Sequence, residues 1–170
     1  AAIGQSNNNY TTVQLARYVT AVANEGTVYQ YTLLNRLEDS DGNVLQTFEP
    51  QVRNQIDVLD TEEWNAIHSG MRMVVENTKE FHGFPIEAAG KTGTAQQNLK
   101  RPNHALFVGY APYDDPEISI ATRIAYGYTS HNAAKLARNV FAYYFNVENE
   151  DELLNGQAAN GNSSSNEISD

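Results

Sequence analysis

The sequence contains no cysteine, which excludes disulfide bonds, thiol catalysis and cysteine-based metal sites. It has no run that approaches the roughly 18 apolar residues of a membrane-spanning helix, and it does not begin with a basic-then-apolar signal segment. Four histidines are present, but their spacing is not that of metal ligands. We therefore expect no metal and no cofactor, and we expect each histidine at a surface or at a helix end.

Basic residues are also few. The chain carries 21 Asp and Glu against 11 Lys and Arg, which gives a formal charge of -10. Residues 148–170 are acidic, then rich in Asn, Ser and Gly, and contain no Lys or Arg. Nucleic-acid binding needs a basic surface, so we expect no nucleic-acid partner. Residues 148–170 cannot bury enough apolar surface to fold, so we predict a disordered tail there.

Apolar residues at helical spacing predict three helices. The first begins near Thr11, where Gln14 completes a capping box, and the second begins near Asp60. A closing helix follows Gly127 to Ser130, with Ser130 or Asn132 as its cap. The stripe that we expect the second helix to bury consists of Trp64, Ile67, Met71 and Val74.

Strand patterns fill most of the remaining chain. Residues 28–34 and 44–48 flank an Asp-Gly turn signal, which predicts an accessory hairpin at about 28–50. Further strands are expected around Lys91, at 105–110 and at 118–126, with a short connection that favours antiparallel pairing. This order of elements predicts an α+β fold, an antiparallel sheet with packed helices.

The chemically most informative stretch is Lys91-Thr92-Gly93-Thr94, in the strand expected around Lys91. Glycine weakens a strand, so it usually marks a place where a ligand or another backbone comes close. Lys91 offers three hydrogen-bond donors, and Thr92 and Thr94 lie on the same face of an extended strand. The pattern therefore predicts a strand edge that grips a carboxylate.

Two other interpretations fit the same residues. Thr-Gly is a common loop pair, so the four residues are also compatible with a surface turn. Gly90-Lys91-Thr92 is the end of a phosphate-loop motif, whose first glycine would fall at Pro85. Gly83 lies two positions too early, and no amphipathic helix follows Thr92 to hold a phosphate, so the sequence disfavours a nucleotide site.

Four further stretches accompany this motif in a characteristic order and spacing. They are Ile3-Gly4-Gln5, Thr12 to Ala16, Val22 to Thr27, and His104 to Pro112, with Phe84 to Gln96 containing the motif itself. Together they resemble the C-terminal half of the transpeptidase domain of class B penicillin-binding proteins, over roughly residues 1–146. Lys-Thr-Gly is the third motif of these active-serine enzymes.

The resemblance implies a penicillin-binding, β-lactamase-like fold, with residues 1–147 as the C-terminal portion of the domain. It implies a serine-type D,D-transpeptidase that cross-links peptidoglycan stem peptides ending in D-Ala-D-Ala and that β-lactams acylate. Lys91, Thr92, Gly93 and Thr94 would bind the substrate carboxylate, and the Thr94 backbone N–H would form half of the oxyanion hole. The protein would lie on the extracytoplasmic face of a bacterial membrane, anchored by an upstream segment, with cell-wall synthesis machinery as a possible partner.

The nucleophile of that chemistry is missing, because no serine in the chain has a lysine three residues later. S-x-N occurs at Ser6, Ser130 and Ser164, and three matches in one short chain indicate chance. We therefore expect the catalytic serine in the remainder of the domain, upstream, and an inactive isolated chain. The alternative is a non-catalytic penicillin-binding-like sensor or interaction module.

Other polar residues are weaker candidates. Those expected to border the cleft are His104, Arg123, Tyr126 and Tyr128. The acids of the connection between the last two strands are expected to form a solvated turn rather than a catalytic pair, and they are Asp114, Asp115 and Glu117.

Overall fold

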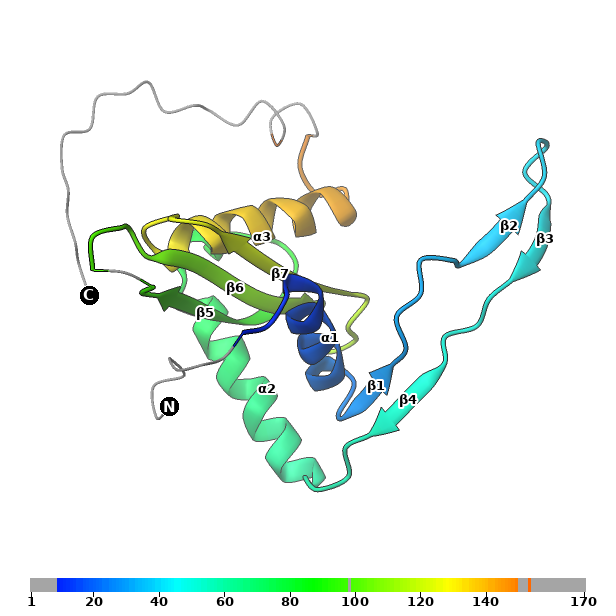
Figure 1. Ribbon diagram of the computed structural model, residues 1–170, viewed down its shortest axis with the longest axis horizontal. Helices are drawn as coiled ribbons and strands as arrows, with labels where there is room; N and C mark the ends of the chain where they lie inside the picture. Colours follow the sequence, from blue (N-terminus) through cyan, green and yellow to red (C-terminus); the bar gives the residue numbers. More distant parts are fainter. Residues whose placement is uncertain (1–8, 98, 150–152, 154–170) are drawn as a thin grey trace.

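The computed structural model describes residues 9–97, 99–149 and 153 (Figure 1). The predicted tail therefore lies almost wholly outside the described residues. The elements, in chain order, are α1 Thr12–Ala23, β1 Thr27–Tyr29, β2 Arg36–Glu38, β3 Val44–Thr47, β4 Val52–Gln55, α2 Thr61–Glu76, the 3-10 helix η1 Lys79–Phe81, β5 Ala89–Ala95, β6 His104–Ala111, β7 Ile118–Ile124 and α3 Ser130–Tyr144. All strand pairs are antiparallel, so the predicted α+β class is confirmed.

Side-chain caps begin the first two helices where the sequence predicts them. In α1 the Thr11 hydroxyl accepts from the Gln14 N–H at 3.2 Å, and the Gln14 side chain accepts from the Thr11 N–H at 2.8 Å. Asp60 and Glu63 form the same reciprocal box at α2, with both bonds at 2.9 Å. Such a box satisfies two backbone donors that the first turn leaves without partners.

The cap of α3 corrects the prediction. Thr129, rather than Ser130 or Asn132, is the N-cap, and its hydroxyl accepts from the His131 N–H at 3.2 Å. Ser130 is the first residue inside the helix. The helix starts one residue earlier than a Ser130 cap would place it.

The main sheet has the order β5-β6-β7. β5 pairs with β6 alone, so its other edge carries no strand in the described part of the chain. α3 covers one face of the sheet, and α1 and α2 lie on the other (Figure 1). The sheet edge that bears Lys91 is therefore open between two helical layers.

The core divides between the two faces of the sheet. On the α3 side, Phe107 and Phe141 are fully buried, and Phe81 stacks on Phe107 with ring centroids 5.7 Å apart. Small residues let α3 approach the sheet closely, namely Ala133, Ala134 and Ala137. On the opposite side, Val19 of α1 packs with Tyr110, and burial raises the pKa of this tyrosine above its usual range.

Residues 27–55 form an extended arm that projects away from the main sheet (Figure 1). The Asp39 to Asn43 tip is where the sequence predicts the turn, but the predicted pairing of 28–34 with 44–48 is wrong. In a hairpin, residues at equal distances from the tip face each other. Tyr29 therefore pairs with Val52, and β3 pairs with the unpredicted strand β2.

The buried stripe of α2 also differs from the prediction. Ile67 is exposed, whereas His68, one residue on, turns inward to the interface with α1. Its Nε2 lies 2.8 Å from the Val22 carbonyl, and its ring meets Tyr110 edge-on with centroids 5.7 Å apart. His68 is thus a packing residue and not the surface histidine that the sequence suggested, because its ring can satisfy a polar group while contacting apolar neighbours.

Gly109 lies where a side chain has no room, and this generates a stability prediction. A Cβ there would lie 2.6 Å from the Ala89 carbonyl oxygen and 2.7 Å from the Phe107 ring. We expect Gly109→Ala to lower the free energy of unfolding by about 1–3 kcal/mol, the usual cost of overpacking. Chemical denaturation of the purified chain measures this.

Gly70→Ala is the matched control, since a Cβ at this position of α2 meets nothing within 4 Å. Alanine is the better helix former, so this variant should gain up to about 1 kcal/mol. Equal effects of the two substitutions would contradict the described packing of β5 on β6.

The arm tip generates a second prediction. The Asn43 side chain donates to the Asp39 carboxylate at 2.9 Å, and the Asn43 and Asp41 N–H groups add bonds at 2.8 and 2.9 Å. These bonds hold the pKa of Asp39 below its ordinary value, with the Asn43 side chain as the largest cause. Their contribution to tip stability is present above the unfolded-state pKa and is lost as pH falls through the folded-state pKa.

Titration of the Asp39 carboxyl carbon by NMR tests this. We expect a pKa below that of an unstructured aspartate, and an upward shift of the pKa in Asn43→Ala. An unchanged value in the variant would show that the amide does not stabilise the carboxylate.

Candidate active site

The sequence of β5 carries the strand from the core to the surface. Ala89 and Gly90 are buried, whereas Lys91 and Thr94 are exposed. The antiparallel register is regular throughout, with Lys91 opposite Val108 and Thr94 opposite Ala105. The predicted site residues therefore lie on the exposed half of an edge strand and not in a surface turn.

The two glycines of β5 have different roles in packing. A Cβ at Gly90 would lie 2.4 Å from the Phe107 ring, so the core of this chain requires glycine there. A Cβ at Gly93 would meet only the Leu106 Cβ, at an ordinary contact distance of 3.5 Å. The chain's own packing does not require glycine at 93, which leaves free space on the strand surface beside Lys91.

Lys91 presents an uncompensated positive charge at this edge. Its ammonium donates to the Thr92 carbonyl at 2.8 Å, and within the described residues it forms no ion pair. A cation that is held by a carbonyl and neutralised by no carboxylate can attract an anion.

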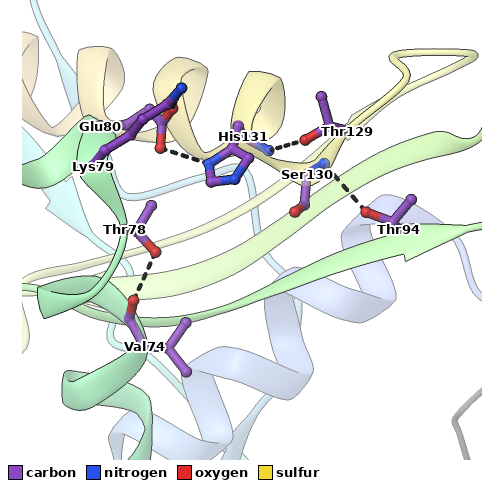
Figure 2. Close-up of polar contacts among 8 residues, drawn as sticks. All are labelled: Val74, Thr78, Lys79, Glu80, Thr94, Thr129, Ser130 and His131. Carbon is purple, nitrogen blue, oxygen red and sulfur yellow. Dashed lines mark hydrogen bonds and ion pairs between the residues drawn. The ribbon is translucent and has the colours of Figure 1, made fainter. Parts of the chain in front are cut away.

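Thr92 and Thr94 face the α3 side of the sheet, and Lys91 and Gly93 face the α1 and α2 side, since successive side chains of a strand alternate. Figure 2 shows the Thr94 hydroxyl below the start of α3, where it accepts from the Ser130 N–H at 3.3 Å. No sequence pattern predicts this contact, because its donor is a backbone group 36 residues away.

Residues 1–143 match the family described as the penicillin binding protein transpeptidase domain. The chain belongs to this family. Together with the curated relatives described next, this match confirms the predicted resemblance of the chain to the transpeptidase domain of class B penicillin-binding proteins.

Curated relatives support the same membership. The chain is 34% identical over 165 residues to the peptidoglycan D,D-transpeptidase MrdA of Haemophilus influenzae, covering 85% of this chain and 25% of the relative. It is 28% identical over 181 residues to penicillin-binding protein 2A of Bacillus subtilis, covering 94% of this chain and 25% of the relative. The chain thus spans about a quarter of the length of these bacterial relatives.

Solved structures share the fold. The chain superposes on the D,D-transpeptidase domain of a peptidoglycan glycosyltransferase from Eggerthella lenta with a TM-score of 0.67 and 29% identity, covering 81% of this chain and 32% of that one. An imipenem acyl-enzyme complex of penicillin-binding protein A from Mycobacterium tuberculosis gives a TM-score of 0.73 at 22% identity, covering 85% and 33%. The second likeness concerns the fold alone.

Within this transpeptidase-domain chain, His104 does not border an open cleft as the sequence suggested. It is buried, and its Nδ1 accepts from the Tyr126 N–H at 3.1 Å. Because Nδ1 accepts, the proton lies on Nε2, which donates to the Gln97 side chain at 2.9 Å. His104 therefore ties the chain beyond β5 to the end of β7 and has no ring nitrogen left for a ligand.

The other weaker candidates lie away from Lys91. Arg123 is exposed on β7, which β6 separates from β5, and Tyr126 accepts from Arg101 at 2.7 Å. Tyr128 is exposed beyond β7. The acids between β6 and β7 lie at the end of the sheet where β5 begins and are exposed, as the sequence predicts for a solvated turn; they are Asp114, Asp115 and Glu117.

In the described part of the transpeptidase-domain chain, no helix is long and apolar enough to cross a membrane. Two of its serines lie on other elements than Lys91: Ser119 of β7 is hydrogen-bonded to the Thr20 hydroxyl of α1, and Ser130 is the first residue of α3. Within the described residues, the Lys91 ammonium donates to the Thr92 carbonyl and to no serine.

Proposed function

We propose that this chain is the carboxylate-binding edge of a serine-type D,D-transpeptidase domain that cross-links peptidoglycan stem peptides ending in D-Ala-D-Ala. The observation that carries the proposal is Lys91, an uncompensated cation on an unpaired strand edge in a chain of this family. β-Lactams would bind the same edge as mimics of the stem peptide, in keeping with the β-lactam acyl-enzyme complexes among the proteins that share the fold.

The roles of the four residues follow from acyl transfer. A serine attacks the peptide carbonyl, and donors stabilise the oxyanion that forms. Lys91 would attract the terminal carboxylate and favour deprotonation of nearby groups, and the hydroxyls of Thr92 and Thr94 would donate to the carboxylate. Gly93 would let the substrate backbone approach the strand.

The orientation of the β5 backbone supports an oxyanion role for the Thr94 N–H. The Thr92 carbonyl is within reach of the Lys91 ammonium, at 2.8 Å, and so points to the open edge. Backbone groups two residues apart in a strand point the same way, so the Thr94 N–H also points to that edge. It is therefore available to half of an oxyanion hole.

The attacking serine, its activating lysine and the middle motif would come from the remainder of the same domain. The apolar residues that α2 exposes, Ile67 and Met73, are suited to contact with that part. By the same proposal the domain works outside the bacterial cytoplasmic membrane, anchored by another segment of the protein and associated with cell-wall synthesis machinery.

The absence of S-x-x-K from the chain favours one second candidate, a non-catalytic penicillin-binding-like sensor or interaction module. Sequencing the gene upstream of the Ala1 codon separates the two. An in-frame S-x-x-K within a few hundred codons supports the transpeptidase, and a start codon at that position supports the module.

The proposed function predicts that the isolated 170-residue chain does not react with penicillins, because it lacks the S-x-x-K nucleophile. Incubation with a fluorescent penicillin, followed by denaturing electrophoresis, should give no labelled band. A full-length D,D-transpeptidase labelled in parallel is the control. Labelling of the chain that disappears in Ser130→Ala or another serine variant would contradict the prediction.

A further prediction of the proposed function concerns Lys91 in the complete domain that carries this chain. Removing one preorganised electrostatic group typically costs about 10²–10³ in rate, so we expect Lys91→Ala to slow benzylpenicillin acylation by roughly that factor. The melting temperature should change little, because among the described residues the one hydrogen bond of the ammonium is to the neighbouring Thr92 carbonyl. Stopped-flow acylation and thermal unfolding measure the two effects.

Lys135→Ala is the matched control, since Lys135 is an exposed lysine of α3. It should acylate at the parent rate. An unchanged rate in Lys91→Ala would remove Lys91 from the site.

A further inference from the structure

The start of α3 meets β5 at Thr94. The N–H group of Ser130 points at the Thr94 hydroxyl oxygen, 3.3 Å away (Figure 2). Ser130 is the first residue of α3, and the first N–H groups of a helix have no partner within the helix. The contact therefore satisfies a free helix donor with a side chain of the candidate site.

The position of this helix start is determined by contacts with other elements. His131 Nδ1 lies 2.9 Å from the Glu80 carboxylate of η1, and the Glu80 side chain is only 9% exposed. The Asn132 amide donates to the Gly127 carbonyl at 2.8 Å, which ties the same turn to the end of β7. These bonds leave the Ser130 N–H little freedom to move away from Thr94.

A threonine hydroxyl has one proton to donate and two lone pairs that accept. The Ser130 N–H takes up one lone pair of Thr94 and repels the hydroxyl proton from its own side. In the described part of the chain the Thr94 hydroxyl donates to no acceptor. Its proton is consequently directed away from α3, and the open edge of β5 is the side that remains.

We propose that the Ser130 backbone N–H is a positioning group for the transpeptidase site, which holds the Thr94 hydroxyl as a donor to the carboxylate of the stem peptide or β-lactam. This inference rests on the proposed function and extends it to α3. Ser130 acts through Thr94 and does not itself touch the substrate.

A backbone donor can be removed here by proline. Ser130 occupies the first helical position, where proline is well tolerated. Thr129, with φ -127° and ψ 147°, already has the extended conformation that a residue before proline adopts. Ser130→Pro therefore deletes the N–H and preserves the helix, and Ser130→Ala, which deletes only the hydroxyl, is the matched control.

In the complete domain, we expect Ser130→Pro to slow benzylpenicillin acylation about three- to tenfold relative to Ser130→Ala, the range of one weakened hydrogen bond to a charged group. The loss should be much smaller with benzylpenicillin methyl ester, which has no carboxylate. A general disturbance of α3 would slow both compounds equally, and this result would overturn the inference.

A double-mutant cycle with Thr94→Val completes the test. If Ser130 acts through Thr94, Ser130→Pro has no further effect in the Thr94→Val background but keeps its effect in Thr94→Ser. Additive losses would show independent roles and overturn the inference alone. If Thr94→Val leaves acylation unchanged, the proposed carboxylate site fails instead.

An NMR measurement covers the case in which Ser130→Pro does not fold. The Ser130 amide proton should shift and exchange faster in Thr94→Val than in the parent and in Thr94→Ser. Equal shifts and exchange rates in all three proteins would show that the hydrogen bond is absent, which overturns the inference.

Discussion

The structure depends on the packing of the Phe107 ring against two glycines, Gly90 of β5 and Gly109 of β6. The ring is fully buried, and a Cβ at Gly90 or Gly109 would lie within 2.8 Å of it. Phe81 of η1 stacks on the same ring, and the alanine stripe of α3 closes over this face. This contact sets the height of α3 above β5 and so brings the helix start to Thr94.

The charge at the candidate site is opposite in sign to the net charge of the chain. The formal charge is -10, yet in the described residues Lys91 has no carboxylate partner, while Arg72 and Arg138 each pair with glutamates. A paired lysine would gain little at an exposed site and would lose its attraction for a substrate anion. The position of Lys91 on an open strand edge, without a described carboxylate partner, is in keeping with the proposed role in anion binding.

Two predictions made from apolar residues, the buried stripe of α2 and the strand pairing of the arm, are wrong for geometric reasons. Ile67 is the more apolar residue, but a stripe through Trp64, His68, Met71 and Val75 faces the rest of the chain, and the His68 ring bonds to the Val22 carbonyl. In the arm, the tip position determines which residues face each other, so the apolar strands at 28–34 and 44–48 do not pair.

The sequence by itself determined the helix starts at Thr11 and Asp60, the antiparallel three-strand block and the Lys91 motif, because caps, alternation and short connections act between residues close in the chain. Only the tertiary structure decided that His104 is buried and that the Ser130 N–H reaches Thr94. Both depend on backbone N–H groups that lie 22 and 36 residues from their acceptors in the chain. Because every residue except proline carries the same backbone N–H, the sequence does not indicate which N–H makes such a contact.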